Sequence, residues 1–310
     1  MPILKVENLK VHFPIKGGIF GRTVDYVKAV DGVSLEIEKG TTYGLVGESG
    51  SGKTTTGRAI IGLNKITSGK VYFEGKEVTN LRRSRASFHR DVQMIFQDPY
   101  SSLNPKKRVL DIVAEPLRNF EKMSRSEEKK RVEELLELVG LSPESIVKYP
   151  HQFSGGQRQR IGIARAIALK PKLIIADEPV SALDVSVQAQ VLNFMQEIQK
   201  ELDLTFLFIS HDLGVIRHMC NQIGIMYRGR FVEEGLTEDI FNNPQHIYTK
   251  RLVAAIPNID PSKREDSLQF RKEVDHEYKQ SYANYFDEDG LAYNLQPVSE
   301  THFVALPEKG

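Results

Sequence analysis

The sequence predicts an α/β fold with a largely parallel β-sheet that helices cover on both faces. Segments 42–47 (TYGLVG), 173–177 (LIIAD) and 204–210 (LTFLFIS) are short apolar runs, as expected for strands buried on both faces. Helical sequence separates the last two of them, over 185–202. Apolar strands that alternate with helices favour parallel pairing, because parallel neighbours need a crossover connection.

The N-terminal part predicts two further strands, at 3–13 (ILKVENLKVHF) and 33–37 (VSLEI). The loop expected between them contains Gly17, Gly18 and Gly21. The strand at 42–47 ends in a glycine-rich turn, and TTTGRAIIGL (54–63) then predicts a helix. A phosphate-binding loop requires this order of strand, loop and helix.

The middle of the chain is largely helical. Ser124 and Glu127 have the spacing of a capping box, which predicts a helix that Gly140 ends. Its apolar face comprises Val132, Leu135, Leu136 and Val139. A further helix is predicted over 156–169. From about residue 258 the sequence is polar without a sustained period, and we expect a loosely ordered tail or one docked on a partner.

Composition limits the possible functions. The chain has 310 residues, 40% of them apolar and 27% charged, which is typical of a soluble globular protein. The net charge of +1 argues against a nucleic-acid binder. Without a long apolar run or a signal segment, we expect a cytosolic chain that reaches a membrane through partners. The single Cys220 excludes an internal disulfide, and the histidines lack the spacing of a structural metal site.

The clearest chemical motif is a phosphate-binding loop that matches G-x-x-x-x-G-K-[ST]. Its residues are Gly47, Glu48, Ser49, Gly50, Ser51, Gly52, Lys53 and Thr54. Glycines let backbone N–H groups curl around phosphates, and the helix that follows adds its positive end. Lys53 would neutralise the phosphates, and Thr54 would offer its hydroxyl to Mg²⁺. The motif predicts a nucleoside triphosphate site but does not say what hydrolysis drives.

Two adjacent acids follow the buried strand 173–177. Ligands collect at the carboxyl ends of parallel strands, so Asp177 is placed to hold Mg²⁺. Glu178, one residue further on, is placed to orient or deprotonate an attacking water. Acids at a strand end are common in loops, and the phosphate-binding loop upstream is what makes this pair informative.

Between these motifs the chain reads Phe153, Ser154, Gly155, Gly156 and Gln157. This run resembles the L-S-G-G-Q signature of ATP-binding-cassette (ABC) ATPases, with Phe in the first place. In that family the signature of one subunit covers the ATP bound by a second subunit. The resemblance extends over about residues 3–235.

Other family elements follow in order. Gln97 resembles the Q-loop glutamine, which touches Mg²⁺ or water and responds to the transmembrane partner. Asp184 lies in a run, SALD, that resembles the D-loop at the dimer interface, and His211 resembles the switch histidine near the γ-phosphate. We also expect Thr55 to contact the nucleotide, next to Thr54. Phe13 stands where the family places an aromatic ring on adenine, with Tyr26 as the alternative and ordinary packing as the third possibility.

The resemblance implies a P-loop NTPase (RecA-like) core with a mixed, largely parallel sheet, an inserted helical subdomain and a C-terminal extension. We expect the ATPase domain over 1–235, with its core at about 1–97 and 170–235 and the helical subdomain at about 98–169. The extension would occupy 236–310. QDPYSSLNP (97–105) and NPQHIYTKRL (243–252) resemble the oligopeptide/dipeptide/nickel importers, although the second run is equally a generic docking helix.

Such an importer implies several partners. We expect a second ABC ATPase subunit (a paralogue or a second copy), two membrane-spanning permeases and an extracytoplasmic peptide-binding protein, with ATP and Mg²⁺ as ligands. The chain would then lie at the cytoplasmic face of the membrane and drive oligopeptide uptake. Import of dipeptides or nickel is an alternative. So is a soluble ABC ATPase acting on nucleic acid or ribosomes, for which the basic residues Arg82, Arg83, Arg85, His89 and Arg90 would matter. A cassette without turnover is disfavoured because Lys53, Asp177, Glu178 and His211 are all present.

Overall fold

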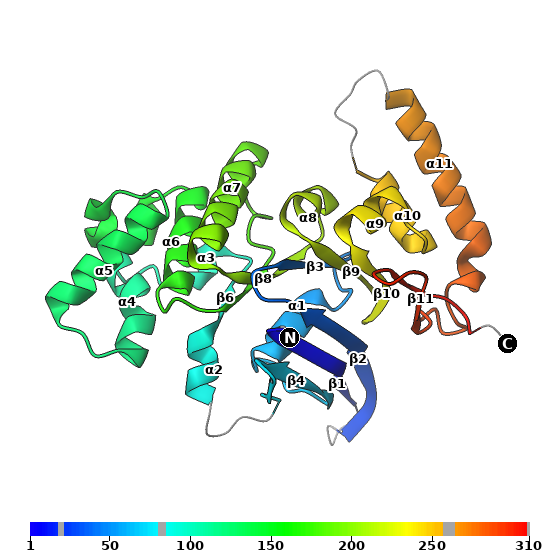
Figure 1. The fold of residues 1–310 in the computed structure, drawn as a ribbon, viewed down its shortest axis with the longest axis horizontal. Helices are drawn as coiled ribbons and strands as arrows, with labels where there is room; N and C mark the ends of the chain where they lie inside the picture. Colours follow the sequence, from blue (N-terminus) through cyan, green and yellow to red (C-terminus); the bar gives the residue numbers. More distant parts are fainter. Residues whose placement is uncertain (18–21, 80–84, 257–263, 309–310) are drawn as a thin grey trace. The chain divides into compact units, whose positions relative to one another are not determined.

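The chain divides into two units that interleave along the sequence (Figure 1). The computed structural model describes residues 1–17, 22–79, 85–256 and 264–308. Unit 1 consists of Met1–Ile3, Ile37–Thr41 and Asn80–Ile209. Unit 2 consists of Leu4–Glu36, Thr42–Thr79 and Ser210–Gly310.

Unit 1 contains three parallel strands, β6 (Val92–Ile95), β7 (Leu173–Asp177) and β8 (Thr205–Ser210), with β7 in the middle. Leu173 lies opposite Val92 on one side and Thr205 on the other. Every residue of β7 and β8 is buried. The expectation of parallel strands covered on both faces is therefore confirmed for this part of the chain.

Helices make up most of the rest of unit 1. They are α2 (Arg85–Asp91), α3 (Pro99–Ser102), α4 (Val109–Phe120), α5 (Arg125–Leu138), α6 (Gly155–Ile167) and α7 (Val185–Leu202), with 3-10 turns η1 (Pro143–Val147) and η2 (Pro150–Gln152). The predicted capping box opens α5. The Ser124 hydroxyl accepts from the Glu127 N–H at 3.3 Å, and the Glu127 carboxylate accepts from the Ser124 N–H at 2.8 Å. The apolar face of α5 is buried, as predicted, against its helical neighbours.

Unit 2 contains two sheets. In the antiparallel one, the order is β2 (Arg22–Ile37), β1 (Leu4–Gly17), β4 (Ser68–Phe73) and β5 (Lys76–Glu77). β1 and β2 are longer than the predicted strands. Gly17 belongs to β1 rather than to a loop, while Gly18 and Gly21 lie outside the described residues. The sequence did not predict this extra length, because residues 22–28 are exposed on both faces. They therefore show no sustained alternation of apolar and polar residues from which a strand could be recognised.

The second sheet of unit 2 carries the phosphate-binding loop. Here β3 (Thr42–Val46) pairs in parallel with β9 (Gln222–Tyr227), and antiparallel pairs then join β9 to β10 (Arg230–Leu236), β10 to β12 (Phe303–Ala305) and β12 to β11 (Leu295–Pro297). Helices α1 (Lys53–Ile60) and α8 (Leu213–Met219) follow β3 and β8 in the chain.

The C-terminal part of unit 2 is ordered, so the expected loose tail is wrong for its described residues. Helices α9 (Thr237–Asn242), α10 (Ile247–Ala254) and α11 (Arg264–Ser281) precede a 3-10 turn, η4 (Tyr282–Asn284), and α10 and α11 lie side by side (Figure 1). Phe286, Ala292, Val304 and Ala305 are buried. These apolar residues are too widely spaced to produce a period that sequence reading could detect. None of the described helices combines the length and apolarity needed to cross a bilayer.

Candidate nucleotide-binding site

The loop between β3 and α1 requires glycine at two points. Gly47 and Gly52 have φ of +153° and +107°. A Cβ on Gly47 would lie 2.3 Å from the carbonyl oxygen of Met226, and one on Gly52 would lie 2.3 Å from that of Ala29. No side chain fits at either position, and the backbone can therefore curl tightly into the N-terminus of α1.

Lys53 points back into this curl. Its side chain is 4% exposed, and its Nζ donates to the carbonyl oxygens of Gly47 at 2.7 Å and Glu48 at 2.9 Å. The Ser51 hydroxyl is buried and has no hydrogen-bond partner among the residues that the structure describes. Thr54 and Thr55 are half-buried in the first turn of α1. A buried cation, an unpaired hydroxyl and a helix N-terminus together fit a phosphate group.

Two hydrogen bonds hold the loop backbone from outside the motif. The N–H of Gly229, in the turn between β9 and β10, donates to the Ser51 carbonyl at 2.9 Å. The N–H of Glu48 donates to the hydroxyl of Tyr248 on α10 at 3.2 Å. Sequence reasoning missed Tyr248 because it lies in a run that reads as a generic docking helix.

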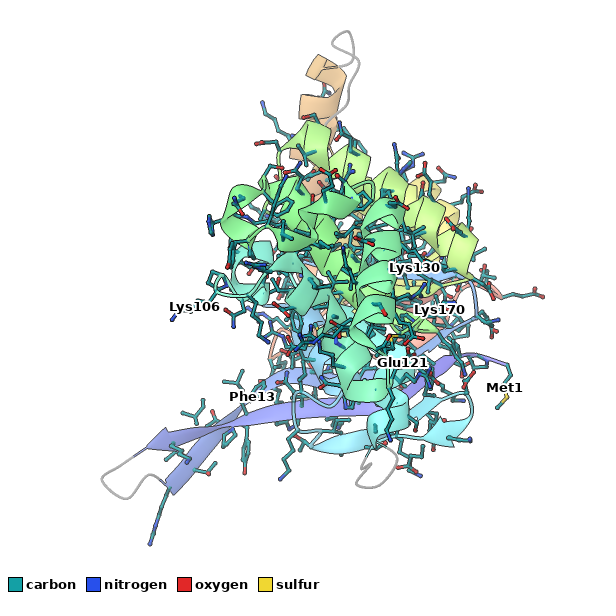
Figure 2. All side chains as sticks on the ribbon, turned by 90° about the vertical axis from the view of Figure 1, so that its left-hand side faces the viewer. Met1, Phe13, Lys106, Glu121, Lys130 and Lys170 are labelled. Atoms are coloured by element: carbon teal, nitrogen blue, oxygen red, sulfur yellow. The ribbon has the colours of Figure 1, made fainter. Side chains whose placement is uncertain are left out.

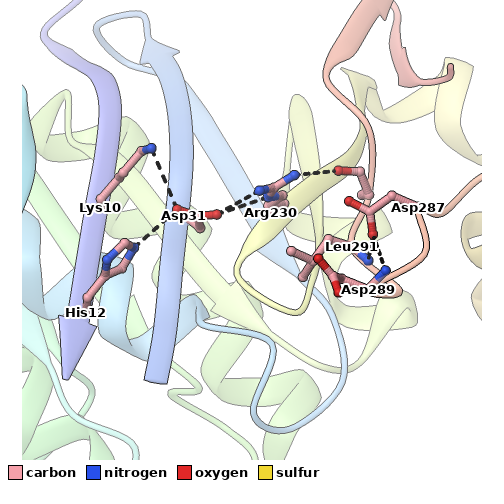
Figure 3. A network of polar contacts seen from close by, with 8 residues as sticks. Lys10, His12, Asp31, Arg230, Asp287, Asp289 and Leu291 are labelled. Atoms are coloured by element: carbon pink, nitrogen blue, oxygen red, sulfur yellow. Dashed lines mark hydrogen bonds and ion pairs between the residues drawn. The ribbon is translucent and has the colours of Figure 1, made fainter. Parts of the chain in front are cut away.

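Asp31, whose charged neighbours are drawn in Figure 3, holds the Gly229 turn through its backbone. The Asp31 N–H donates to the Gly229 carbonyl at 2.8 Å, and the Asp31 carboxylate accepts from Arg230 at 2.8 Å and contacts the His12 Nε2 at 3.1 Å. Lys10 lies 3.8 Å away on the same side as His12. Burial alone would raise the pKa of Asp31, but hydrogen bonds from Arg230 and His12 lower it on balance. The Asp31 carboxylate is therefore held ionised next to the Gly229 turn that supports the phosphate-binding loop.

The acidic pair lies in unit 1, at the end of β7. Asp177 is fully buried and Glu178 is partly exposed. Glu178 adopts a left-handed conformation with φ of +47°, while its N–H donates to the Ile209 carbonyl of β8 at 2.9 Å. Such a conformation is costly for a residue other than glycine and is concentrated at functional sites.

Gln97 contacts Glu178, as expected if both residues act on the same bound water or Mg²⁺. It follows β6 and is exposed, and its Nε2 donates to the Glu178 Oε2 at 2.9 Å. The structure thus brings together two predicted residues that are 81 positions apart in the chain.

The signature run opens α6. Ser154 is the N-cap: its hydroxyl accepts from the Gln157 N–H at 3.4 Å, and its own N–H donates to the Gln157 side chain at 3.0 Å. Gly156 is buried against α7, where a Cβ would lie 2.4 Å from Cγ1 of Val187. Gly155 packs near Leu183. Ser154 and Gln157 remain exposed, and so does Asp184 at the start of α7.

The remaining predicted residues lie on the surface of unit 2. His211 directly follows β8 and is exposed, one residue before Asp212, which caps α8. Phe13 lies on β1 with 42% of its surface exposed (Figure 2), and Tyr26 on β2 is 53% exposed. Neither ring belongs to the core. The phosphate-binding loop thus belongs to unit 2 and the acidic pair to unit 1.

Comparisons with known proteins agree with this set of motifs. The ABC transporter family model matches residues 30–181, and the model of the oligopeptide/dipeptide transporter C-terminal region matches 232–280. An oligopeptide transport ATP-binding protein of Lactococcus lactis is 56% identical over 309 residues, covering 99% of this chain and 97% of that protein. Its counterpart in Bacillus subtilis is 48% identical over 310 residues, covering 99% and 96%. A dimeric ATP-binding cassette solved with ADP and phosphate, MJ0796, has a TM-score of 0.67 at 30% identity, covering 76% of this chain and 98% of that one.

The chain therefore belongs to the ABC transporter ATP-binding proteins, with the α/β P-loop NTPase fold that the sequence predicts. More narrowly, it is the ATP-hydrolysing subunit of an importer of the oligopeptide-transport type, and so works with a membrane permease.

Proposed function

We propose that residues 47–54 hold the triphosphate of ATP, with Lys53 neutralising its charge and Thr55 extending the contacts along α1. Phe13 stacks on the adenine ring, for which its exposed position on β1 leaves room. The observation that carries the proposal is the tight curl of the loop around the buried Lys53 ammonium. Backbone N–H groups in such a curl bind an anion whatever the rest of the ligand is.

We assign hydrolysis to Glu178, Gln97 and His211. Glu178 orients or deprotonates the attacking water, Gln97 fixes the carboxylate through the 2.9 Å hydrogen bond, and His211 contacts the terminal phosphate. Thr54, Gln97 and Asp177 supply only oxygen donors, which suit Mg²⁺, and would hold it. When bound, Mg²⁺ neutralises phosphate charge and polarises the group to be transferred.

The signature residues Ser154, Gly155, Gly156 and Gln157 act on the nucleotide of a second cassette, and Asp184 lies at the interface between the two. The exposure of Ser154, Gln157 and Asp184 supports this role. So does the dimeric state of the similar cassette, MJ0796. The partner is a paralogue or a second copy of this chain.

The complex then contains two permeases and an extracytoplasmic peptide-binding protein, with this chain peripheral to the cytoplasmic face of the membrane. We divide the chain into an ATPase domain at 1–235 and an importer-type extension at 236–310, in line with the two matched regions. Oligopeptides are the proposed cargo because the Lactococcus and Bacillus relatives are oligopeptide transport proteins.

A soluble ATPase acting on nucleic acid or ribosomes has less support. Arg90 pairs with Glu121 at 3.0 Å and Lys107 with Glu115 at 3.1 Å, so acids offset part of the basic sequence. Arg82 and Arg83 lie outside the described residues, and Arg85 and His89 belong to α2. Phosphate-backbone binding needs an uncompensated basic face.

Substitution of Glu178 by Gln tests the proposal. We expect steady-state ATPase activity to fall by at least about 100-fold while ATP affinity stays within about two-fold, because the change removes a base and leaves the phosphate contacts. In cells that lack the chain, wild type should restore uptake of labelled oligopeptides and Glu178→Gln should not. Unchanged ATPase activity would refute the role of Glu178. Restored uptake of dipeptides or Ni²⁺ alone would refute oligopeptides as the cargo.

A further inference from the structure

Tyr248 is a buried phenol that touches the phosphate-binding loop. Its side chain is fully buried on α10, and its hydroxyl oxygen accepts the Glu48 N–H at 3.2 Å across 200 residues of sequence. Burial raises the pKa of Tyr248 well above its usual range, so the phenol keeps its proton. The contact is therefore a neutral hydrogen bond from loop backbone to a side chain of the C-terminal region.

This bond holds the first half of the loop. The second half is held at Ser51, whose carbonyl accepts from Gly229 at 2.9 Å. Between the two anchors, the Ser51 N–H donates to the Glu48 carbonyl at 3.2 Å, so the segment closes on itself. Removing either anchor frees one end of a turn whose shape must match a phosphate group.

Aromatic rings from β9 and from the C-terminal region surround Tyr248. The ring of Tyr227 lies 4.8 Å from that of Tyr248 and 4.9 Å from that of Phe286, centroid to centroid. Tyr282 stacks on Phe286 at 4.3 Å. His246 accepts the Tyr248 N–H through Nδ1 at 3.1 Å. Ring contacts of this kind stabilise a cluster beyond the area they bury.

A second, independent contact reaches the other anchor. Arg230 donates to the Ala292 carbonyl at 3.0 Å and to Asp31 at 2.8 Å (Figure 3). Asp31 holds the Gly229 turn through its backbone N–H. Hydrogen bonds thus link both anchors of the loop to residues between positions 247 and 292, directly at Tyr248 and through Asp31 and Arg230 at Ala292.

We propose that Tyr248 is a positioning residue for the phosphate-binding loop, and that through it the C-terminal region at 247–292 sets the affinity of the subunit for ATP. The proposal rests on the phosphate-binding role proposed for residues 47–54. A loop held in its binding shape before ATP arrives loses less conformational freedom on binding, and its affinity is correspondingly higher. The C-terminal extension is then part of the nucleotide site.

Replacement of Tyr248 by Phe removes one oxygen atom and keeps the ring in the cluster. We expect the Kd for a fluorescent N-methylanthraniloyl-ATP probe to rise about five-fold, which corresponds to ~1 kcal/mol. The KM for ATP should rise by the same factor and kcat should stay within about two-fold, because the bond serves ground and transition states equally. Tyr282→Phe is the matched control, since the Tyr282 hydroxyl lies 3.5 Å from that of Tyr227 and does not touch the loop.

Amide hydrogen exchange separates positioning from stability. In Tyr248→Phe, exchange at Glu48 should accelerate about ten-fold while the Tm stays near that of Tyr282→Phe. The wild-type protein gives a check without any substitution, because nucleotide-free Glu48 should exchange at least about ten-fold more slowly than the exposed Ser49 and Gly50.

Two outcomes would overturn the proposal. In the first, Tyr248→Phe binds the probe with the same Kd as Tyr282→Phe. In the second, the Glu48 amide of the wild-type protein exchanges as fast as that of Ser49. Lys53→Ala distinguishes this failure from failure of the site itself. If Lys53→Ala binds the probe as tightly as wild type, the phosphate-binding role of the loop is wrong. If Lys53→Ala loses binding while Tyr248→Phe does not, only the positioning role is wrong.

Discussion

Replacement of His302 by Ala should destabilise unit 2 strongly, because it removes a partner from a fully buried carboxylate. Glu233 is 0% exposed on β10, and its Oε1 lies 2.6 Å from the His302 Nε2. A carboxylate can only accept, so this nitrogen carries the hydrogen. Glu233 also accepts the N–H groups of Gln245 at 2.8 Å and His246 at 2.9 Å. His302 lies next to β12, so the contact fastens the C-terminal strand to β10.

The magnitude follows from what remains after the substitution. Leaving a buried hydrogen-bonding group without one of its partners costs about 1–3 kcal/mol. Two backbone N–H groups still donate to Glu233 in the variant, which places the expected loss in the middle of this range, at about 2 kcal/mol. For a unit of this size, that corresponds to a fall in Tm of roughly 4–8 °C.

Thermal unfolding followed by far-ultraviolet circular dichroism measures this loss, since the chain contains no tryptophan for fluorescence. His276→Ala is the matched control, because His276 is exposed on α11 and contacts Gln280. It should shift Tm by no more than about 1 °C. If His302→Ala melts together with His276→Ala, the buried contact contributes nothing and the reasoning is refuted.

Two further predictions concern the pH dependence of stability and a helix cap. Burial raises the pKa of Glu234 to about 7 from 4.5, despite a 2.7 Å hydrogen bond from the Tyr43 hydroxyl that lowers it. The native state then holds an extra proton between these values, so stability should fall by roughly 3 kcal/mol as pH rises from 4.5 to 7. Glu234→Gln should lack this loss, and a Tm difference between the two proteins that is equal at pH 5 and pH 8 would contradict the assignment. Ser124→Ala should cost about 1 kcal/mol through loss of the α5 capping box, whereas Ser142→Ala, at an N-cap without a side-chain bond, should cost far less. Equal melting temperatures for the two serine variants would argue against the cap.

Sequence reading succeeded where the chemistry is local. The phosphate-binding loop, the acids after β7 and the capping box of α5 each occupy a few consecutive residues whose types are dictated by backbone shape or ligand charge. Buried strands such as β7 and β8 were predictable for the same reason, since each is continuously apolar.

Sequence reading failed where hydrogen-bond partners are distant along the chain or where neither face of a strand is buried. The Glu48–Tyr248 bond spans 200 residues and the Glu233–His302 contact spans 69. No sequence pattern around these residues predicts that they meet. The exposed arm of β2 has no apolar stripe, and the C-terminal apolar residues lack a period. The left-handed conformation of Glu178 was equally unpredictable, because Glu gives no sign of it.

The interleaved course of unit 2 has a consequence for synthesis on the ribosome. The phosphate-binding loop is translated early, yet its anchor Tyr248 follows Glu48 by 200 residues, and β9, the parallel partner of β3, is also translated late. At about 5–20 residues per second, roughly 10–40 s pass before the anchor emerges. During that interval the nascent loop lacks both of its supports, so we expect it to bind nucleotide more weakly than the finished protein does. The ATP site is thus among the first parts of the protein to be made and among the last to be completed.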